Sequence, residues 1–134
     1  MKNPQHILIT GASSGIGEAL ALFYAQKGVT LFLCAQNTER LSGVAERCRE
    51  KRAEVSAEKV DVTDAAAMEN WISRCDKIAP LDLIIANAGV SAGPGKTGES
   101  SEMTRKIFAV NVNGVLNTVL PALEKMSPRR RGQI

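Results

Sequence analysis

The sequence has few of the residues from which metal centres and disulfide frameworks are built. It contains one histidine, His6, and three cysteines, none of which form a C-x-x-C pair. A single histidine cannot complete a zinc site with cysteines this far apart, so we expect no metal centre. Cys34, Cys48 and Cys75 lie among apolar residues, a pattern that predicts reduced core thiols and a cytoplasmic protein.

Long hydrophobic runs and a large excess of one charge are absent as well. The longest apolar runs have the length of strands, and the N-terminus leads directly into one, so we expect neither a membrane span nor a signal peptide. The net charge of +3 is too small to indicate nucleic acid binding. For the one dense basic cluster, Arg129-Arg130-Arg131, we favour a solvated loop, with a phosphate or nucleic acid contact as the alternative.

What is present is an alternation of short apolar runs and helical patterns. We expect strands over 7–9, 29–34, 55–60 and 81–86, with residues 132–134 beginning another. We expect helices from Ile16 to the stop at Gly28, from a cap at Thr38, from a cap at Thr63 or Asp64, and over roughly 101–126 with a bend at Pro121. This order predicts an α/β fold with a parallel sheet and right-handed crossovers.

Three of these helices have an apolar face that should turn toward the sheet. The expected inner residues are Ile16, Ala19, Leu20 and Phe23 in the first, Leu41, Val44, Ala45 and Cys48 in the second, and Met68, Trp71, Ile72 and Cys75 in the third. The glycine-rich segment 89–98 after the fourth strand is interpreted as the rim of an active site and not as a domain boundary.

The segment T-G-A-S-S-G-I-G, residues 10–17, lies where the first strand turns into the first helix. A pyrophosphate at such a turn meets exposed backbone N–H groups and the positive end of the helix dipole. Glycine is needed where a Cβ would block that approach or where φ is positive. The three glycines alone would also fit an ordinary tight turn, but their spacing is G-x-x-x-G-x-G and not the commoner G-x-G-x-x-G.

Further motifs follow this one in a fixed order. Asp61-Val62 comes after the third strand, Asn87-Ala88-Gly89 after the fourth, and Asn111 lies in the last helix. Together with the glycine segment they resemble the short-chain dehydrogenase/reductase family over essentially the whole chain. The resemblance implies a Rossmann-type doubly wound parallel sheet with strand order 3-2-1-4, incomplete here, and helices on both faces.

The resemblance also implies a role for each motif. Gly11, Gly15 and Gly17 would form the pyrophosphate turn, with contacts from Ser13, Ser14 and Ile16. Asp61 would accept a hydrogen bond from the adenine amino group, and Val62 would add a main-chain contact. Asn87, Ala88 and Gly89 would pass close to the cofactor ribose, and Asn111 would hold a water in the catalytic proton relay. Taken singly, Asp61, Asn87 and Asn111 are also explained as a turn residue, a strand-end hydrogen bonder and a mid-helix polar residue.

The end of the second strand bears on the choice of nicotinamide cofactor. NAD users place an acid here for the ribose 2′-hydroxyl, and the equivalent residue is Ala35. The next position, where NADP users of the family often have arginine, is Gln36, which we include among the cofactor-binding residues. Loss of the acid permits a 2′-phosphate, so we expect NADP in preference to NAD, with Arg40 near enough in sequence to assist or to serve only as a helix-surface residue.

The family's catalytic tyrosine and lysine, spaced Tyr-x-x-x-Lys, are not found. The one tyrosine, Tyr24, is followed by Lys27, three residues on and not four. We therefore expect the catalytic pair beyond Ile134, and residues 1–134 to be a nicotinamide-dinucleotide-binding domain that ends before the catalytic segment. By itself the chain should be inactive, and poorly stable because strands beyond the fourth would be missing from the sheet.

Three functional hypotheses follow. The favoured one is the cofactor-binding part of an oxidoreductase that transfers hydride between nicotinamide and a carbonyl or alcohol substrate, with a dimeric or tetrameric parent protein as the family-level expectation. The alternatives are a non-catalytic dinucleotide-binding or sensor module, and an interaction fragment that uses its open sheet edge. We expect no nucleic acid and no membrane partner.

Overall fold

The computed structural model describes residues 3–93 and 100–134, so part of the expected glycine-rich rim at 89–98 lies outside the described residues. The strands are β1 (His6–Thr10), β2 (Thr30–Cys34), β3 (Glu54–Glu58) and β4 (Leu83–Ile85). The helices are α1 (Gly15–Tyr24), α2 (Thr38–Glu50), α3 (Ala65–Ile78), α4 (Ser101–Phe108) and α5 (Gly114–Met126), with a π-helical turn at Ala109–Asn113 and a 3₁₀ turn at Ser127–Arg129.

The described strands form one parallel sheet in the order β3-β2-β1-β4, which confirms the predicted topology. Ile7 of β1 lies opposite Leu31 of β2 and Leu83 of β4. Because the strands are parallel, their carboxyl ends meet along one edge, and the segments that follow β1, β2, β3 and β4 converge there.

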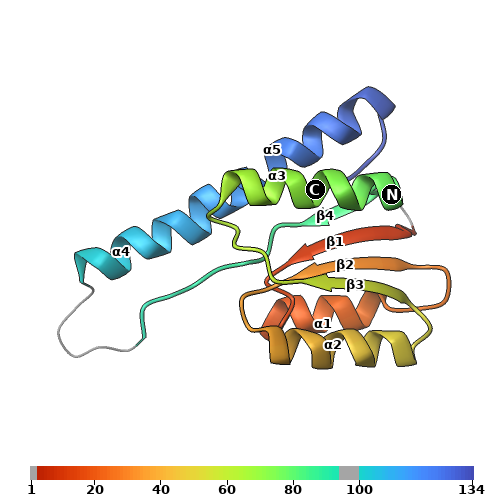
Figure 1. Cartoon of the computed structure of the whole chain (residues 1–134), viewed down its shortest axis with the longest axis horizontal. Coiled ribbons are helices and arrows are strands. Elements are labelled where there is room, and N and C mark those ends of the chain that lie inside the picture. The colour runs from red at the N-terminus through yellow and green to blue at the C-terminus, as the bar shows by residue number, and fades with distance from the viewer. Residues whose placement is uncertain (1–2, 94–99) are drawn as a thin grey trace.

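Helices cover both faces of the sheet, with α1 and α2 on one and α3 and α5 on the other (Figure 1). Each face of the sheet has its own hydrophobic core. Ile7, Ile9, Leu31 and Leu33 pack with α1 and α2, whereas Leu8, Phe32 and Ile84 pack with α3 and α5. Strands that are apolar on both faces are typical of such a three-layer arrangement.

The predicted inner faces of α2 and α3 are confirmed, whereas of the four residues predicted for α1 only Leu20 packs against the core. Ile16 and Phe23 are 72% and 76% exposed, whereas Gly17 and Ala21 are buried. The smallest side chains face inward because a Cβ at Gly17 would collide with the Gly11 carbonyl. The close contact between α1 and the loop before it therefore determines which side of the helix faces the core. This contact overrides the preference that the apolar side chains of α1 would give.

Helix caps follow the local hydrogen-bonding rules. Asn37, and not the expected Thr38, caps α2, since its side-chain oxygen accepts from the Arg40 N–H at 2.9 Å. Asp64, one of the two residues expected, caps α3 by accepting from the Ala67 N–H at 3.0 Å. A carboxylate or amide oxygen at this position satisfies an N–H group that the helix itself leaves unpaired.

The expected long helix at 101–126 is interrupted, but at a different place from the one predicted. Pro121 lies inside α5 and is buried, whereas the irregular backbone is the π-helical turn Ala109–Asn113, which carries Asn111. One extra residue in a helical turn changes the direction of the side chains before and after it, and such turns are frequent at functional sites.

The stretch Ser101–Arg129 has the length and composition of a membrane span, with a mean hydropathy of 1.2. The apolar runs of the sequence did not predict a stretch of this length, because asparagines and a glycine interrupt the uncharged centre of Ser101–Arg129. Part of it is buried on α3, but Phe108, Val112, Leu116, Leu120 and Leu123 form an exposed apolar stripe along the other side.

The C-terminal segment extends the sheet beyond β4. Gln133 and Leu83 form a parallel bridge, with the Ile84 N–H donating to the Gln133 carbonyl at 2.9 Å. The bridge at Gln133 agrees with the prediction that a strand begins in residues 132–134, although the structure assigns only this one bridge there.

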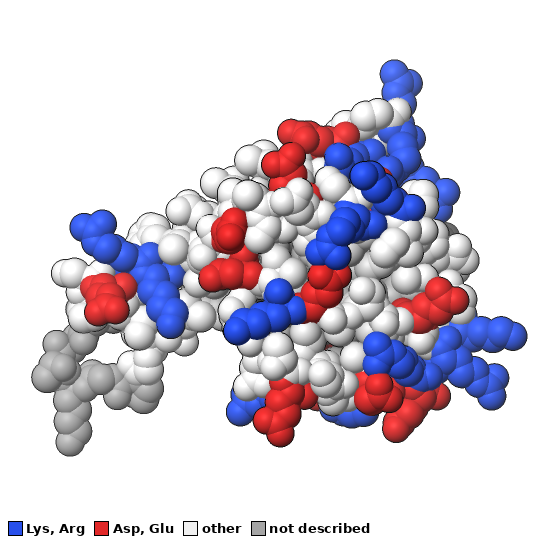
Figure 2. Space-filling model, in the orientation of Figure 1, with Lys and Arg blue, Asp and Glu red and all other residues white. Residues whose placement is uncertain are grey.

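The three arginines of the cluster are exposed, as predicted for a solvated loop, but two of them also make ion pairs that the prediction did not include. Arg129 donates to both carboxylate oxygens of Asp76 at 2.8 Å, and Arg131 lies 3.1 Å from the buried Asp82. Basic side chains gather at this end of the molecule, while both signs are mixed over the rest of the face in view (Figure 2). Two of the three arginines thus hold the segment against α3 and β4.

Candidate functional site

The glycine loop between β1 and α1 is shaped by three glycines that are required for different reasons. Gly15 has a φ of +57° with open space around it, so its conformation alone favours glycine. Gly17 has no room for a Cβ, which would collide with the Gly11 carbonyl. Gly11 has both constraints, a φ of +66° and an added Cβ that would lie 2.7 Å from Ala88 Cα.

The N-terminus of α1 opens toward this loop. Ser14 is the N-cap residue, with extended backbone and no cap hydrogen bond from its side chain. The first N–H groups of a helix have no partner inside the helix, so those of α1 remain available. Together with the helix dipole they can bind an anionic group.

Asn87 connects the end of β4 to the glycine loop. Its Nδ2 donates to the carbonyls of Thr10 at 3.1 Å and Gly11 at 3.2 Å. The buried Thr10 hydroxyl accepts from the N–H groups of Asn87 and Ala88, both at 3.0 Å. These bonds hold the loop and the start of the 87–89 segment at a fixed separation.

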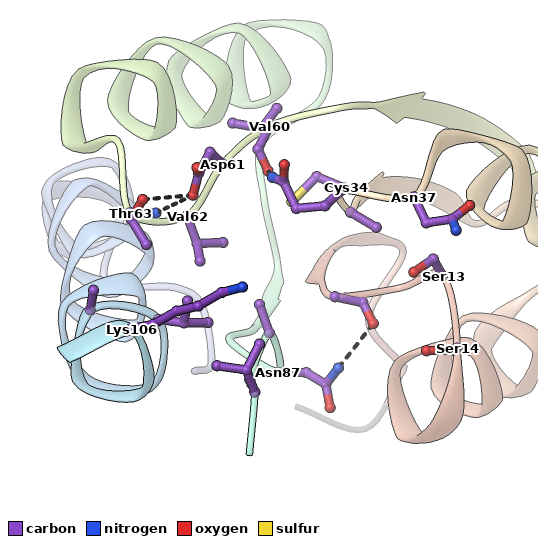
Figure 3. Close-up of a pocket in the computed structure, with 18 of the residues that line it drawn as sticks. Ser13, Ser14, Cys34, Asn37, Val60, Asp61, Val62, Thr63, Asn87 and Lys106 are labelled. Carbon is purple, nitrogen blue, oxygen red and sulfur yellow. Dashed lines mark hydrogen bonds between the residues drawn. The ribbon is translucent and has the colours of Figure 1, made fainter. Parts of the chain in front are cut away.

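A cavity of about 790 Å³ extends along the carboxyl edge of the sheet between these segments (Figure 3). We call it the groove. Among the residues predicted to bind a cofactor, those that line it are Gly11, Ser13, Ser14, Ile16, Gln36, Asp61, Val62, Asn87, Ala88 and Gly89. Gly15 and Gly17 do not line it, and instead set the backbone and the packing behind it.

The structure adds groove residues that sequence reasoning missed. These are Cys34, Asn37, Val60, Thr63, Val90, Lys106, Ala109 and Val110. The ones after β2 and β3 could have been found, because every segment at the carboxyl edge of a parallel sheet faces the same space. Lys106, Ala109 and Val110 carried no such signal, since only the path of α4 and the π-helical turn brings them to the groove.

Asp61 and Gln36, which both line the groove, are oriented by hydrogen bonds with neighbouring residues. Asp61 Oδ1 accepts from the backbone N–H and the hydroxyl of Thr63, at 2.9 and 2.8 Å (Figure 3). Gln36 Nε2 donates to the Val60 carbonyl at 2.9 Å, which ties the ends of β2 and β3 together.

Val62 is held from behind by α5. Asn117 Nδ2 donates to its carbonyl at 2.9 Å, and a Cβ at Gly114 would lie 2.7 Å from Val62 Cγ2. The close approach that Gly114 allows therefore fixes the wall of the groove next to Asp61.

Asn111 does not line the groove but lies behind its rim. Its Oδ1 accepts from the Val90 N–H at 2.8 Å, and its Nδ2 donates to the Val90 carbonyl at 2.9 Å. The π-helical turn presents Asn111 to the segment that follows β4, so this side chain holds the rim beside Gly89.

The groove contains one thiol, Cys34, which has no exposed surface. Burial raises its pKa to about 12, because removal from water disfavours the thiolate. A thiol in this state is a poor nucleophile. The described residues contain no group of histidine, cysteine and acidic side chains that could hold a metal ion.

A second, smaller cavity of about 390 Å³ shares Ser13 and Ser14 with the groove. Its other lining residues come from α1 and α2 and include Arg40 and Arg47. Arg47 forms an ion pair with Glu18, whereas the described structure records no ion pair for Arg40. One cation beside the glycine loop is therefore left without a counter-ion.

Comparison with known proteins places these features among related sequences. A family model described as short chain dehydrogenase matches residues 5–134. An uncharacterized oxidoreductase of Myxococcus xanthus is 35% identical over 128 residues, which are 95% of this chain and 51% of the relative. The chain thus spans about half the length of the curated relatives it matches.

Solved structures share the fold. An alcohol dehydrogenase from the archaeon Thermococcus sibiricus, complexed with 5-hydroxy-NADP, is 30% identical with a TM-score of 0.84, over 96% of this chain and 56% of that one. An NAD⁺-bound xylitol dehydrogenase is 26% identical with a TM-score of 0.89, over 98% of this chain and 52% of that one.

Proposed function

Because the chain belongs to the short-chain dehydrogenase family, we propose that residues 1–134 form the cofactor-binding domain of an NAD(P)-dependent oxidoreductase. The observation that carries the proposal is the groove, which is lined by the glycine loop and by the segments that follow β2, β3 and β4. The close backbone packing behind it requires glycine at positions 11 and 17. The related dehydrogenases that bind NADP or NAD support the proposal.

The residues present fit a dinucleotide. The first N–H groups of α1 and the Ser13 and Ser14 hydroxyls provide donors for the pyrophosphate, with Ile16 beside them. Asp61 Oδ1 is occupied by Thr63, which leaves Oδ2 to accept from the adenine amino group, and the Val62 N–H is left for a main-chain contact. The volume of the groove is within the range of small-molecule sites, roughly 300–1,000 Å³.

We assign Asn87 and Asn111 to positioning within this site. Asn87 holds the glycine loop and passes with Ala88 and Gly89 along the cofactor ribose, and Asn111 fixes the rim at Val90. The family role expected for Asn111, a water in a proton relay, needs the lysine of Tyr-x-x-x-Lys. The proton-relay role of Asn111 can be tested only in a protein that contains both Asn111 and that lysine.

A bound nicotinamide dinucleotide would supply or accept hydride at nicotinamide C4, and the substrate would be a carbonyl compound or an alcohol. The chain's own tyrosine does not serve as the proton donor, because Tyr24 lies on α1, packs against the core and contacts Phe23 edge-to-face with ring centroids 5.1 Å apart. We propose that the chain by itself binds cofactor without turnover, and that the proton relay belongs to sequence beyond Ile134.

For the choice of cofactor we propose NADP in preference to NAD. Ala35, at the position of the NAD-specific acid, has no carboxylate to repel a 2′-phosphate. Gln36 is occupied by the Val60 carbonyl, so it is not free to replace an arginine. Arg40, in the cavity that adjoins Ser13 and Ser14, is the cation we assign to the phosphate.

The experiment is a titration of the full-length gene product with NADPH and NADH, followed by fluorescence. We expect both to bind and NADPH to bind more tightly, and no binding of either would overturn the proposed function. Tighter NADH binding would overturn only the NADP preference.

The assignment of Arg40 is tested with the adenosine half of the cofactor. We expect 2′,5′-ADP to bind more tightly than 5′-AMP, and Arg40→Gln to reduce that ratio by about tenfold. The matched control Arg49→Gln removes the same charge from the same helix outside both cavities, and should leave the ratio unchanged.

We further propose a cytoplasmic protein that contacts neither nucleic acid nor a membrane and that assembles as a dimer or tetramer. The buried free thiols of Cys34, Cys48 and Cys75 support a reducing compartment. The apolar stripe on α4 and α5 supports burial against further protein. Within the described residues, no feature favours the non-catalytic sensor module over the oxidoreductase.

A further inference from the structure

The charges in the groove are few and lie apart. Among the described residues that line it, Lys106 is the only cation and Asp61 the only carboxylate. Asp61 follows β3, at the end of the groove that we assign to adenine. Lys106 belongs to α4, on another wall of the groove. Among the described residues, one positively charged side chain therefore lines the groove, and neither the resemblance nor the sequence pattern assigns it a role.

Lys106 points into the cavity. Figure 3 shows its side chain extending from α4 toward the middle of the groove, with its nitrogen directed toward the side on which Ser13 and Ser14 lie. The described structure records no ion pair or hydrogen bond for this ammonium group, so it is available to contact a ligand in the groove. Lys106 and its neighbour Arg105 are both exposed, but only Lys106 lines the groove.

The ligand that the groove fits needs such a charge. A dinucleotide pyrophosphate carries about two negative charges, whereas the helix dipole at the N-terminus of α1 offers about half a positive charge. The hydroxyls of Ser13 and Ser14 are neutral donors. A cation on the opposite wall would reduce the remaining imbalance, and because Lys106 is exposed its effect is that of a partly screened charge.

We propose that Lys106 is the second half of the diphosphate site, an ammonium that faces the glycine loop across the groove and binds the pyrophosphate from the side opposite α1. The inference rests on the proposed function, since it requires a dinucleotide in the groove. It adds a binding residue contributed by α4. The phosphates would then be held between the two layers of helices on opposite faces of the sheet.

The arginines of the second cavity do not serve this purpose. Arg40 and Arg47 line the adjoining space and not the groove, and Arg47 is already paired with Glu18. The charge from α4 and the charge from α2 therefore act on different phosphates, the pyrophosphate and the 2′-phosphate, and can be tested separately.

The experiment measures binding of ADP-ribose and of adenosine to the full-length gene product by calorimetry at low salt. Both contain the adenine base and its ribose, but only ADP-ribose has the pyrophosphate. We expect Lys106→Gln to weaken ADP-ribose by about fivefold and adenosine by less than about twofold, as for one partly exposed ion pair. Added salt should reduce the difference between wild type and variant.

Two variants serve as matched controls. Lys106→Arg retains the charge and should restore most of the ADP-ribose affinity, and Arg105→Gln removes the adjacent cation, which does not line the groove, and should change neither affinity. Equal losses in Lys106→Gln and Arg105→Gln would overturn the proposal, since net charge alone would explain them. An equal loss for adenosine would also overturn it, because the lysine would then act on the base.

Failure of the underlying function gives a different result. If wild-type protein binds neither ADP-ribose nor adenosine, the groove is not a dinucleotide site and both proposals fail. If ADP-ribose binds and Lys106→Gln leaves its affinity unchanged, the cofactor site stands and only the role of Lys106 is overturned. Thermal unfolding of each variant checks that a lost affinity does not reflect lost structure.

Discussion

Thr10 and Asn87, 77 positions apart in the sequence, join the ends of β1 and β4 through two hydrogen bonds that Asn87 donates. Its backbone N–H donates to Thr10 Oγ1 at 3.0 Å, and its side-chain Nδ2 donates to the Thr10 carbonyl at 3.1 Å. The Thr10 hydroxyl accepts the Ala88 N–H as well, so a single buried oxygen satisfies two backbone donors. Both sides of the proposed cofactor site thus depend on one threonine.

We predict that Thr10→Val destabilises the protein by about 1–3 kcal/mol, because the part-buried Ala88 N–H loses its acceptor and the Asn87 N–H keeps only the Ile85 carbonyl, while the side-chain volume is kept. Chemical denaturation of the full-length protein measures this loss. Thr104→Val is the control, since the described structure records no hydrogen bond for the Thr104 side chain, and it should change stability by less than about 0.5 kcal/mol. Equal effects of the two substitutions would contradict the role of Thr10.

Two helical glycines give a second, paired prediction. Gly17→Ala should destabilise the protein by about 1–3 kcal/mol and abolish cofactor binding, because its Cβ would collide with the Gly11 carbonyl. Gly43→Ala should stabilise it by about 0.5–1 kcal/mol, since open space surrounds that position in α2 and alanine favours a helix. Thermal unfolding and NADPH titration measure both, and a tolerated Gly17→Ala would show that the loop can shift.

The third prediction concerns the cysteines. Burial is the main cause that raises the pKa of Cys34 and of Cys75 to about 12, and it also raises that of Cys48. Near pH 8 the thiolate fraction is therefore very small, and native protein should react with a thiol reagent at least about a hundredfold more slowly than unfolded protein. Mass spectrometry after timed alkylation would show it. Fast modification of Cys34 in native protein would mean that the groove opens to solvent.

A pH dependence is expected at the ion pair between Asp76 and Arg129. Burial opposes the charge of Asp76, but hydrogen bonds from Arg129 and the Leu81 N–H outweigh it, so the pKa of Asp76 lies below its ordinary 3.8. A lowered carboxyl pKa stabilises the folded state above the ordinary value, and this stabilisation is lost as pH falls below 3.8 toward the folded-state pKa.

Asp76→Asn is the variant that tests the contribution of the Asp76–Arg129 ion pair. It should cost about 1 kcal/mol at pH 7 and reduce the loss of stability below about pH 4. Denaturant titrations at a series of pH values give both numbers. The same acid dependence in wild type and variant would assign it to other carboxylates.

The 134-residue chain on its own should self-associate or unfold without cooperativity. The stripe of Phe108, Val112, Leu116, Leu120 and Leu123 is exposed. Among the described residues, the β4 edge of the sheet is paired only with Gln133. Sedimentation together with calorimetry tests this. Cooperative thermal unfolding of a monomer at ordinary temperature would contradict it.

The apolar patterns of α2 and α3 predicted their buried residues because each helix has one wide apolar face and a single sheet to cover. The pattern failed at α1, where steric contact between Gly17 and Gly11 decides which side faces inward. It also placed the irregularity of the long helix at Pro121, whereas packing around Asn111 and Gly114 is associated with a π-helical turn at 109–113.

The sequence by itself determined the order of strands and helices, the glycine loop and the polar residues at strand ends, since these depend on periodicity, backbone conformation and local caps. Only the tertiary structure decided that Gln36 is bound to Val60, that Arg40 faces a separate cavity, and that Lys106 points into the groove. These relations join residues of different elements. They follow from how closely the layers pack on the sheet, a quantity that no local pattern of side chains encodes.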